Sequence, residues 1–192
     1  YLVNGDTDFL YHAYMTSRNT MGELEKSVFD LNYGMFKGPS VFNDGIAGYD
    51  EPIYDQAISS SGVVDFPGSK DIKCLSTNCV YDEAYRILSA MALLYGDKKV
   101  SKVYSLKAKT LKENIRKYLY DSKSGNLNYL IDQKGMVHSY HEDLGISFAI
   151  LCGIVDRKEA QKIINHIYLY PYGIPSIYPP FKRFSDDKPG HH

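Results

Sequence analysis

The sequence predicts an all-α protein built from helical hairpins, with long loops and one small β-hairpin. Three observations support this. Apolar residues recur at three- and four-residue spacing over several long segments. These segments come in pairs joined by short turns, and stretches rich in Pro, Gly and Tyr separate the pairs. Three such pairs would form about half of an (α/α)6 toroid, in which six helical hairpins close into a ring.

The first pair is expected over residues 8–19 and 21–33. Phe9, His12 and Ala13 lie three and four positions apart, as residues on one face of a helix do. The tight junction between the two segments predicts an antiparallel hairpin.

The second pair, over 79–95 and 98–120, has the clearest pattern. Gly96 suits the end of the first helix, and with Asp97 it forms the turn. The inward face of the first helix is expected to carry Val80, Ala84, Ile87, Leu88, Met91 and Leu94.

The third pair is expected over 140–154 and 156–168. Asp156 and Glu159 have the spacing of a capping box at the start of its second helix. In the polar stretch before this pair, residues 128–131 and 136–137 flank a turn and predict the β-hairpin.

Residues 1–192 are expected to form a single partial domain. An open half-ring would leave apolar helix faces bare, so we expect further chain on both sides. The start also looks cut, because Tyr1 opens in mature-looking sequence.

Composition excludes several classes of function. The net charge is −1 and no basic stripe is present, which argues against a nucleic-acid partner. No stretch approaches the roughly 20 apolar residues of a membrane span. The three cysteines form neither a disulfide framework nor a zinc pattern, and no dinucleotide or nucleotide-phosphate motif predicts a cofactor. The 18 Tyr residues suit either sugar rings or the core of a chain without Trp.

The stretch 42–56 (FNDGIAGYDEPIYDQ) concentrates chemistry in a long loop. It holds four carboxylates, which are Asp44, Asp50, Glu51 and Asp55. Crowded carboxylates repel one another, so the pKa of at least one should rise if the loop is buried. A carboxyl group of that kind can act as a general acid. The alternative is an acidic turn with no catalytic role.

Three segments resemble one family. GYDEPIYD (48–55) is similar to the S-G-x-D-x-S-P-x-[YW]-D type of motif of α/α-toroid glycoside hydrolases. LSTNCVYDEAYRILSAMALLYGD (75–97) resembles the helix that follows that motif. GIPSIYPPF (173–181) resembles the lead-in to a later family segment. The family is the six-hairpin glycosidase group, with family 63 glucosidases, mannosylglycerate-hydrolase-like enzymes and, more distantly, trehalases. The resemblance covers roughly residues 40–192.

The resemblance implies a catalytic domain that hydrolyses α-glucoside-like bonds with inversion. The motif's general acid falls on Asp50. Glu51 stands where the family has Asn or an aromatic residue, and the motif Ser is absent, so either Asp50 or Glu51 could do this work. The general base of the family matches no segment and is expected beyond His192. The resemblance also favours a location outside the cytoplasm.

Six further residues are candidate contacts for a carbohydrate substrate. They are Asp44, Tyr49, Tyr54, Asp55, Asn78 and Glu142. Each has an ordinary alternative, since tyrosines fill cores, Asn caps helices and acidic residues favour helix N-termini. His138 and His141, with Glu142 beside them, echo a metal-ligand spacing. No third ligand is evident beyond the two histidines, so no metal is expected.

Two other classes of function stay open. Sugar epimerases and polysaccharide lyases share the toroid fold, and here they would use Tyr140 and His141 as acid and base. A non-catalytic, Tyr-rich glycan-binding or scaffold domain is the other possibility. Fold alone does not decide among these classes.

Overall fold

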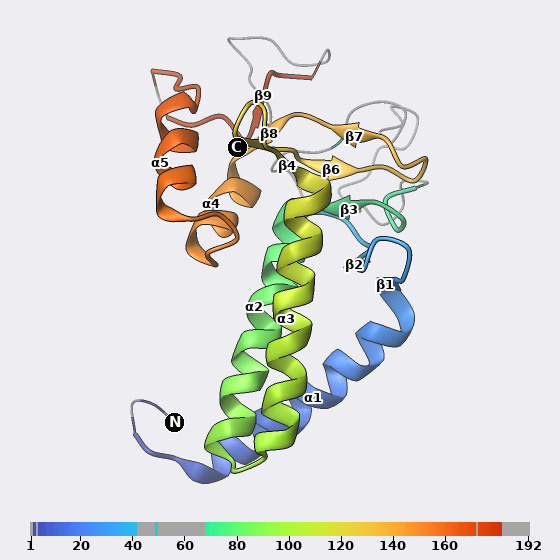
Figure 1. Cartoon of the computed structure of the whole chain (residues 1–192), viewed down its shortest axis with the longest axis vertical. Coiled ribbons are helices and arrows are strands. Elements are labelled where there is room, and N and C mark those ends of the chain that lie inside the picture. The colour runs from blue at the N-terminus through green and yellow to red at the C-terminus, as the bar shows by residue number, and fades with distance from the viewer. Residues whose placement is uncertain (1, 3, 42–48, 50–67, 172, 182–192) are drawn as a thin grey trace.

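The computed structural model describes residues 2, 4–41, 49, 68–171 and 173–181 (Figure 1). Within them the helices are α1 (Thr7–Val28), α2 (Leu75–Leu94), α3 (Lys98–Leu119), α4 (Asp143–Leu151) and α5 (Arg157–His166). The short strands are β1 (Phe29–Asp30), β2 (Met35–Phe36), β3 (Lys73–Cys74), β4 (Tyr120–Asp121), β5 (Asn126–Leu127), β6 (Leu130–Ile131), β7 (Val137–His138), β8 (His141–Glu142) and β9 (Ile177–Tyr178).

The described part is therefore mainly helical but not purely all-α. Several small antiparallel strand pairs accompany the helices, where the sequence predicted one hairpin. Each strand has two residues, which is too short for an alternating apolar pattern to reveal it. The prediction of an all-α fold is correct for the helices, but it is wrong in leaving out most of these strands.

The helical hairpin of α2 and α3 is confirmed. The two helices run side by side along the molecule (Figure 1). Gly96 turns the chain with φ +92°, and the side chain of Asp97 caps α3 by accepting from the Val100 N–H at 3.1 Å. Leu88, Leu111 and Ile115 are buried in the core that includes both helices.

The predicted inward face of α2 is half correct. Leu88 is buried, and Ala84 and Met91 pack against the core. Val80, Ile87 and Leu94 are instead 40%, 47% and 50% exposed. The buried positions of α2 include polar Ser76, Asn78 and Asp82 as well as apolar side chains. Apolar residues lie nearly all round this helix, so their spacing cannot tell which face packs against the rest of the protein.

The first predicted pair is wrong, because α1 is one continuous helix. Asp6 caps it by accepting from the Phe9 N–H at 2.8 Å, and Met21 is buried at the place where the break was expected. Gly22 lies inside the helix, where a glycine costs only about 1 kcal/mol relative to alanine. The chain reverses direction only later, at Gly34, which lies between β1 and β2.

The third predicted pair corresponds to α4 and α5. α4 begins at Asp143, later than expected, because His141 and Glu142 are in a strand. α4 packs on α2. The capping box of Asp156 and Glu159 at the start of α5 is confirmed. Glu159 also accepts two hydrogen bonds from Arg116 of α3, at 2.8 Å each, and so ties α5 to the central hairpin.

The strands gather at the end of the molecule away from the α2–α3 turn (Figure 1). There β3, β6 and β7 form an antiparallel sheet, in which the predicted hairpin is the pair β6–β7. β8 pairs with β9, with His141 opposite Tyr178. A second apolar cluster lies here, separate from the helical core, and contains Tyr49, Ile72, Cys74, Tyr129, Leu130, Ile177 and Phe181. We call this end of the molecule the strand end.

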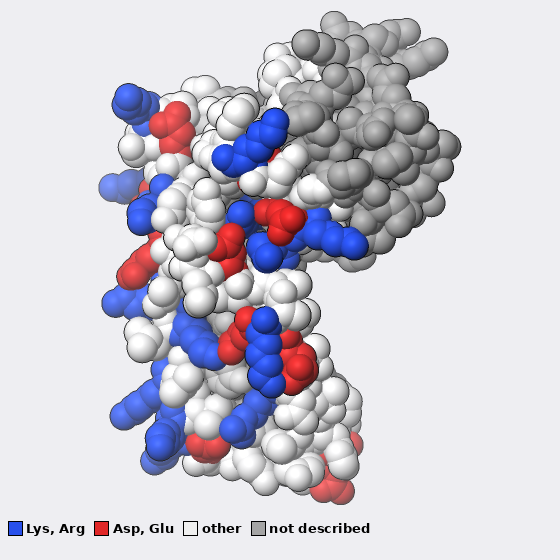
Figure 2. All heavy atoms as spheres, turned by 90° about the vertical axis from the view of Figure 1, so that its right-hand side faces the viewer, with Lys and Arg blue, Asp and Glu red and all other residues white. Residues whose placement is uncertain are grey.

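The surface of the helices carries charges of both signs, intermixed on the face shown in Figure 2. Some form ion pairs between elements, such as Lys107 of α3 with Glu25 of α1 at 2.6 Å. No helix in the described ranges combines the length and the apolar character needed to cross a bilayer.

Candidate functional site

The structure describes three of the predicted site residues: Tyr49, Asn78 and Glu142. The other five predicted site residues, Asp44, Asp50, Glu51, Tyr54 and Asp55, lie outside the described residues. All three described residues are buried at or near the strand end. The structure thus brings together residues from distant parts of the sequence.

Glu142 is the most unusual of them. It ends β8 and caps α4, where its Oε2 accepts from the Gly145 N–H at 2.6 Å. The residue is only 1% exposed. Its other oxygen, Oε1, is buried and has no hydrogen-bond partner among the described residues. A Cβ on residue 145 would clash with the carboxylate, so glycine is required there for this close approach.

Burial raises the pKa of Glu142 to about 8, and the neighbouring Asp143 raises it further, while the hydrogen bond from Gly145 opposes the shift. The carboxyl group is therefore mostly protonated at pH 7. A neutral carboxylic acid can donate a proton, which is the property that general acids share.

Tyr49 lies in the same neighbourhood. Its hydroxyl accepts from the Ser40 N–H at 3.1 Å, and the Ser40 Oγ lies 3.3 Å from the hydroxyl of Tyr129. The Tyr49 and Tyr129 rings are nearly parallel, with centroids 6.3 Å apart. Burial is the main cause of the raised pKa of both tyrosines, and the charge of ionised Glu142 adds a smaller contribution, so the three side chains lie near one another.

Asn78 has its hydrogen bonds satisfied within the protein. Its Oδ1 accepts from the Phe36 N–H at 2.8 Å. Its Nδ2 donates to the carbonyls of Phe36 and Cys74, at 3.0 and 2.9 Å. Asn78 therefore holds β2 against the start of α2. Its contact with a substrate stays a prediction.

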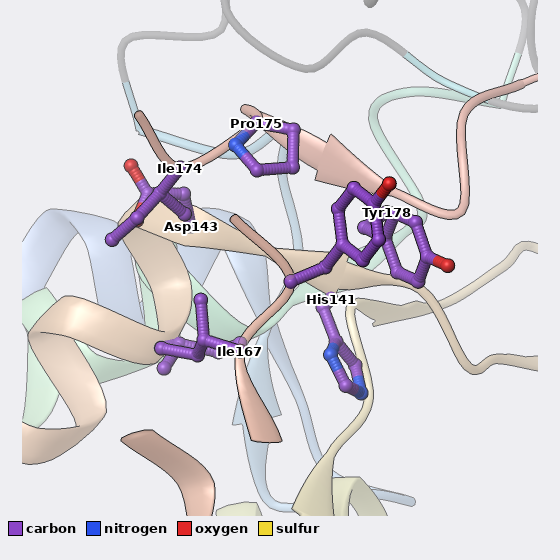
Figure 3. Close-up of a pocket in the computed structure, with 8 residues that line it drawn as sticks. His141, Asp143, Ile167, Ile174, Pro175 and Tyr178 are labelled. Atoms are coloured by element: carbon purple, nitrogen blue, oxygen red, sulfur yellow. The ribbon is translucent and has the colours of Figure 1, made fainter. Parts of the chain in front are cut away.

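A shallow pocket opens on the other side of the same strand (Figure 3). In a strand, successive side chains point to opposite faces. Accordingly, Glu142 is buried, whereas His141 lines the pocket. Asp143, the first residue of α4, and Tyr178 of β9 also line it. The sequence H-E-D at 141–143 thus supplies one buried acid and two pocket residues. The cavity itself measures only about 10 Å³, which is room for about one water molecule.

Burial shifts both titratable pocket residues toward their neutral forms. It lowers the pKa of His141 and raises the pKa of Asp143. A neutral imidazole can accept a proton or donate a hydrogen bond. Tyr140, the other residue of the epimerase alternative, is half-buried and packs edge-on against Phe181 at 4.8 Å between centroids.

Sequence reasoning missed Asp143 and Tyr178 as site residues. Asp143 had the ordinary interpretation of an acid in a first helical turn, and Tyr178 lay in an extended Pro-rich stretch. The signal that could have found the pocket was alternation within β8, where the neighbouring side chains of His141 and Glu142 point to opposite faces. Asp143 reaches the pocket as the first residue of α4. Among the described residues, no group of three or more His, Cys, Asp or Glu side chains is arranged to hold a metal ion.

The fold is one that known carbohydrate-processing proteins contain. No protein-family model matches the sequence, and no curated protein matches it. Solved structures do. A GH78 family rhamnosidase of Bacillus sp. GL1 matches 85% of this chain and 15% of its own, with a TM-score of 0.63 and 17% identity. A protein named sialidase matches 97% of this chain and 16% of its own, with a TM-score of 0.70 and 17% identity.

A sugar epimerase from a ruminal bacterium matches 98% of this chain and 42% of its own, with a TM-score of 0.54 and 16% identity. At such identities the likeness shows the fold alone. The chain also spans only 15% and 16% of the first two proteins. The expected resemblance to sugar-processing proteins is therefore supported at the level of the fold, and closure into a toroid stays a prediction.

Proposed function

We propose that this chain is part of a carbohydrate-active enzyme that hydrolyses glycosidic bonds, with Asp50 as the general acid and Glu51 as the alternative. One observation carries the proposal. Tyr49, which directly precedes Asp50 in the sequence, lies in the same buried environment as the protonated carboxyl group of Glu142. The fold shared with a rhamnosidase agrees with this class of chemistry.

The proposed reaction needs two carboxyl groups. In inverting hydrolysis one protonates the leaving oxygen, and the other, about 6.5 to 9.5 Å away, activates water from the opposite face of the sugar. Asp50 would supply the proton. The base is the residue that we expect beyond His192, so catalysis belongs to the whole enzyme. The α-glucoside preference and the inverting outcome both come from the family resemblance.

Within this proposal Glu142 has a supporting place. Its buried carboxyl group caps α4 and lies close to Tyr49, so it helps to fix the strand end. Direct contact between Glu142 and a substrate stays a prediction.

The test uses Asp50→Asn in the full-length enzyme, with 4-nitrophenyl and 2,4-dinitrophenyl α-glycosides. Loss of a general acid should lower kcat by about 10²–10⁴-fold on the first substrate with little change in KM. The loss should be much smaller on the second substrate, whose better leaving group needs no protonation. Asp8→Asn, at an exposed position of α1, is the matched control. Equal losses on both substrates would show that Asp50 does not act as the acid.

A sugar epimerase is the second candidate. Two features of His141 favour it. The side chain lines the pocket, and burial lowers its pKa, which favours the neutral imidazole. His141→Ala should then abolish incorporation of solvent deuterium into a free sugar, whereas Asp50→Asn should leave it intact. If His141→Ala has no such effect, this candidate is eliminated. A binding module would show neither hydrolysis nor exchange.

A further inference from the structure

Glu142 lies where three elements of the strand end meet. It ends β8, and the pairing with β9 places Ile177 opposite it. Its Oε2 accepts a buried hydrogen bond from the Gly145 N–H and so caps α4. The N–H of Asp143, the next residue, donates to the Ser176 carbonyl at 3.2 Å, beside β9. A change in the state of this one carboxyl group therefore reaches β8, β9 and α4 together.

The packing around the carboxyl group is tight. A Cβ on residue 145 would overlap Glu142 Oε2, and it would lie 3.2 Å from both the Leu75 side chain and the backbone nitrogen of Ser76. Because α2 begins at Leu75, the first turn of α4 lies directly against the first turn of α2. Glu142 and Ser76 are both buried. Solvating the carboxyl group therefore requires that one of these segments move.

The second oxygen of the carboxyl group distinguishes its two protonation states. Oε1 is buried and has no hydrogen-bond partner among the described residues. In the neutral acid Oε1 carries the proton, because Oε2 accepts from Gly145. In the carboxylate Oε1 would share a full negative charge with no donor to stabilise it. An unpaired buried charge costs far more free energy than an unpaired buried hydroxyl. The site thus accommodates the acid and disfavours the carboxylate.

No cation compensates Glu142 in the part of the chain that the structure describes. The charge that acts on it is that of Asp143 on α4, which has the same sign and opposes ionisation. The groups that sense the charge of Glu142 in return are all acids, from β3, α2 and the second apolar cluster: Cys74, Cys79, Tyr49 and Tyr129. The titratable residues of β8 and β9 nearest to it, His141 and Tyr178, line the pocket instead.

Burial sets the pH at which the carboxyl group changes state. It raises the pKa of Glu142 from the ordinary 4.5 to about 8. If the strand end opened, the solvated group would return toward the ordinary value. Between these two values the closed form holds a proton that the opened form releases, so the closed form loses stability as the pH rises and has lost the whole contribution above about pH 8.

We propose that Glu142 is a proton-dependent switch: the neutral acid holds α4 and the β8–β9 pair against α2, and loss of its proton in alkaline solution lets them open. The α2–α3 hairpin stays folded when they do, because its buried contacts are mainly apolar and do not titrate. Proteins open locally in cooperative units of this kind, well below the free energy of global unfolding. The switch is independent of the proposed hydrolysis.

The experiment is hydrogen–deuterium exchange of the full-length protein between pH 6 and pH 9, sampled by quenched flow, with rates corrected for intrinsic exchange. The opening constant of segments 141–149 and 174–178 should rise about 10²-fold over this range. Segment 105–115 of the hairpin should change less than about threefold. A rise of equal size in all three segments, or no rise in the first two, would overturn the proposal.

Glu142→Gln removes the titration and keeps an acceptor for Gly145. In this variant the rise at 141–149 should shrink to less than about threefold. Glu23→Gln is the matched control, because the Glu23 side chain is 75% exposed, and it should keep the full rise. Asp143→Asn should also keep most of it, at a slightly lower pH, since one opposing charge is gone. If Asp143→Asn abolishes the rise and Glu142→Gln does not, Glu142 is not the switch.

A direct readout needs no variant, so poor folding of Glu142→Gln would not prevent a decision. Glutamate labelled with ¹³C at its side-chain carboxyl reports the protonation of Glu142 by NMR. Its signal should titrate near pH 8, together with the rise in exchange at 141–149. A Glu142 carboxyl group that titrates near its ordinary value of 4.5 while this segment stays protected would contradict the proposal.

Discussion

The α2–α3 hairpin and the strand end differ in what they bury. The hairpin contributes mainly apolar side chains such as Leu88, Leu111 and Ile115 to the core. The strand end buries the carboxyl group of Glu142, the hydroxyls of Tyr49 and Tyr129 and the amide of Asn78. Burying polar groups costs free energy unless they are paired, so a protein retains them for specificity or for function. The hairpin thus contributes apolar packing, whereas the strand end holds the buried polar groups.

The largest effect should come from the hairpin core. Leu111→Ala should lower the free energy of unfolding by about 2–5 kcal/mol, because it leaves a cavity among packed side chains. Leu106→Ala on the same helix should cost less than about 1 kcal/mol, since Leu106 is 64% exposed. Urea denaturation measures both. Similar costs for the two variants would remove the distinction between core and surface on α3.

Asn78→Ala tests the junction between the two regions. The change removes three hydrogen bonds and leaves the N–H and C=O of Phe36 buried without their partner. We expect a loss of about 2–4 kcal/mol in urea denaturation. Asn165→Ala, in the exposed Gln161–Asn165 pair of α5, should change stability by less than about 0.5 kcal/mol. A cost for Asn78→Ala as small as the control's would show that Asn78 is not structural and would strengthen its assignment to substrate.

The effect most specific to the strand end is a dependence on pH. The pKa of Glu142 is raised from an ordinary value of 4.5 to about 8 in the folded protein. Between these values the folded state holds a proton that the unfolded state has released. Its contribution to stability is therefore complete below about pH 4.5, and is lost as the pH rises through about 8. The slope from this group should reach at most about 1.4 kcal/mol per pH unit.

Glu142→Gln should flatten that slope, because a neutral amide can still accept from Gly145 and does not titrate. Glu23→Gln serves as the control, since the side chain of Glu23 is 75% exposed. Asp82 and Asp143, whose pKa values burial also raises, keep their own contributions in the variant. If the stability of Glu142→Gln varies with pH as steeply as that of the unchanged protein, the carboxyl group is ionised when buried.

The sequence predicted these two regions unequally. The hairpin could be predicted because α2 and α3 are long, strongly apolar and divided by Gly96 and Asp97, signals that act locally. The face of α2 could not, because apolar side chains such as Val80 and Ile87 lie on several sides of it. The break predicted between residues 19 and 21 was wrong, because α1 continues through it and buries Met21 there.

The strand end was harder to predict because it depends on contacts between distant segments. Glu142 was a candidate only as one acid at a helix start, and its burial follows from β8 pairing with β9 and from Gly145, which permits the close approach. The pocket of His141, Asp143 and Tyr178 requires the same pairing. The roles of Asp50 and Glu51 came from a resemblance and stay predictions.

The most direct measurement of the central claim is ¹H NMR of a mixture of the full-length enzyme with neutral α-glycosides, run beside the Asp50→Asn variant. We expect the unchanged enzyme to release a sugar whose first-formed anomer is inverted, and the variant to release almost none over the same time. Sugar release that is unaffected by Asp50→Asn, or no release from any neutral glycoside, would contradict the proposed role of Asp50 as general acid.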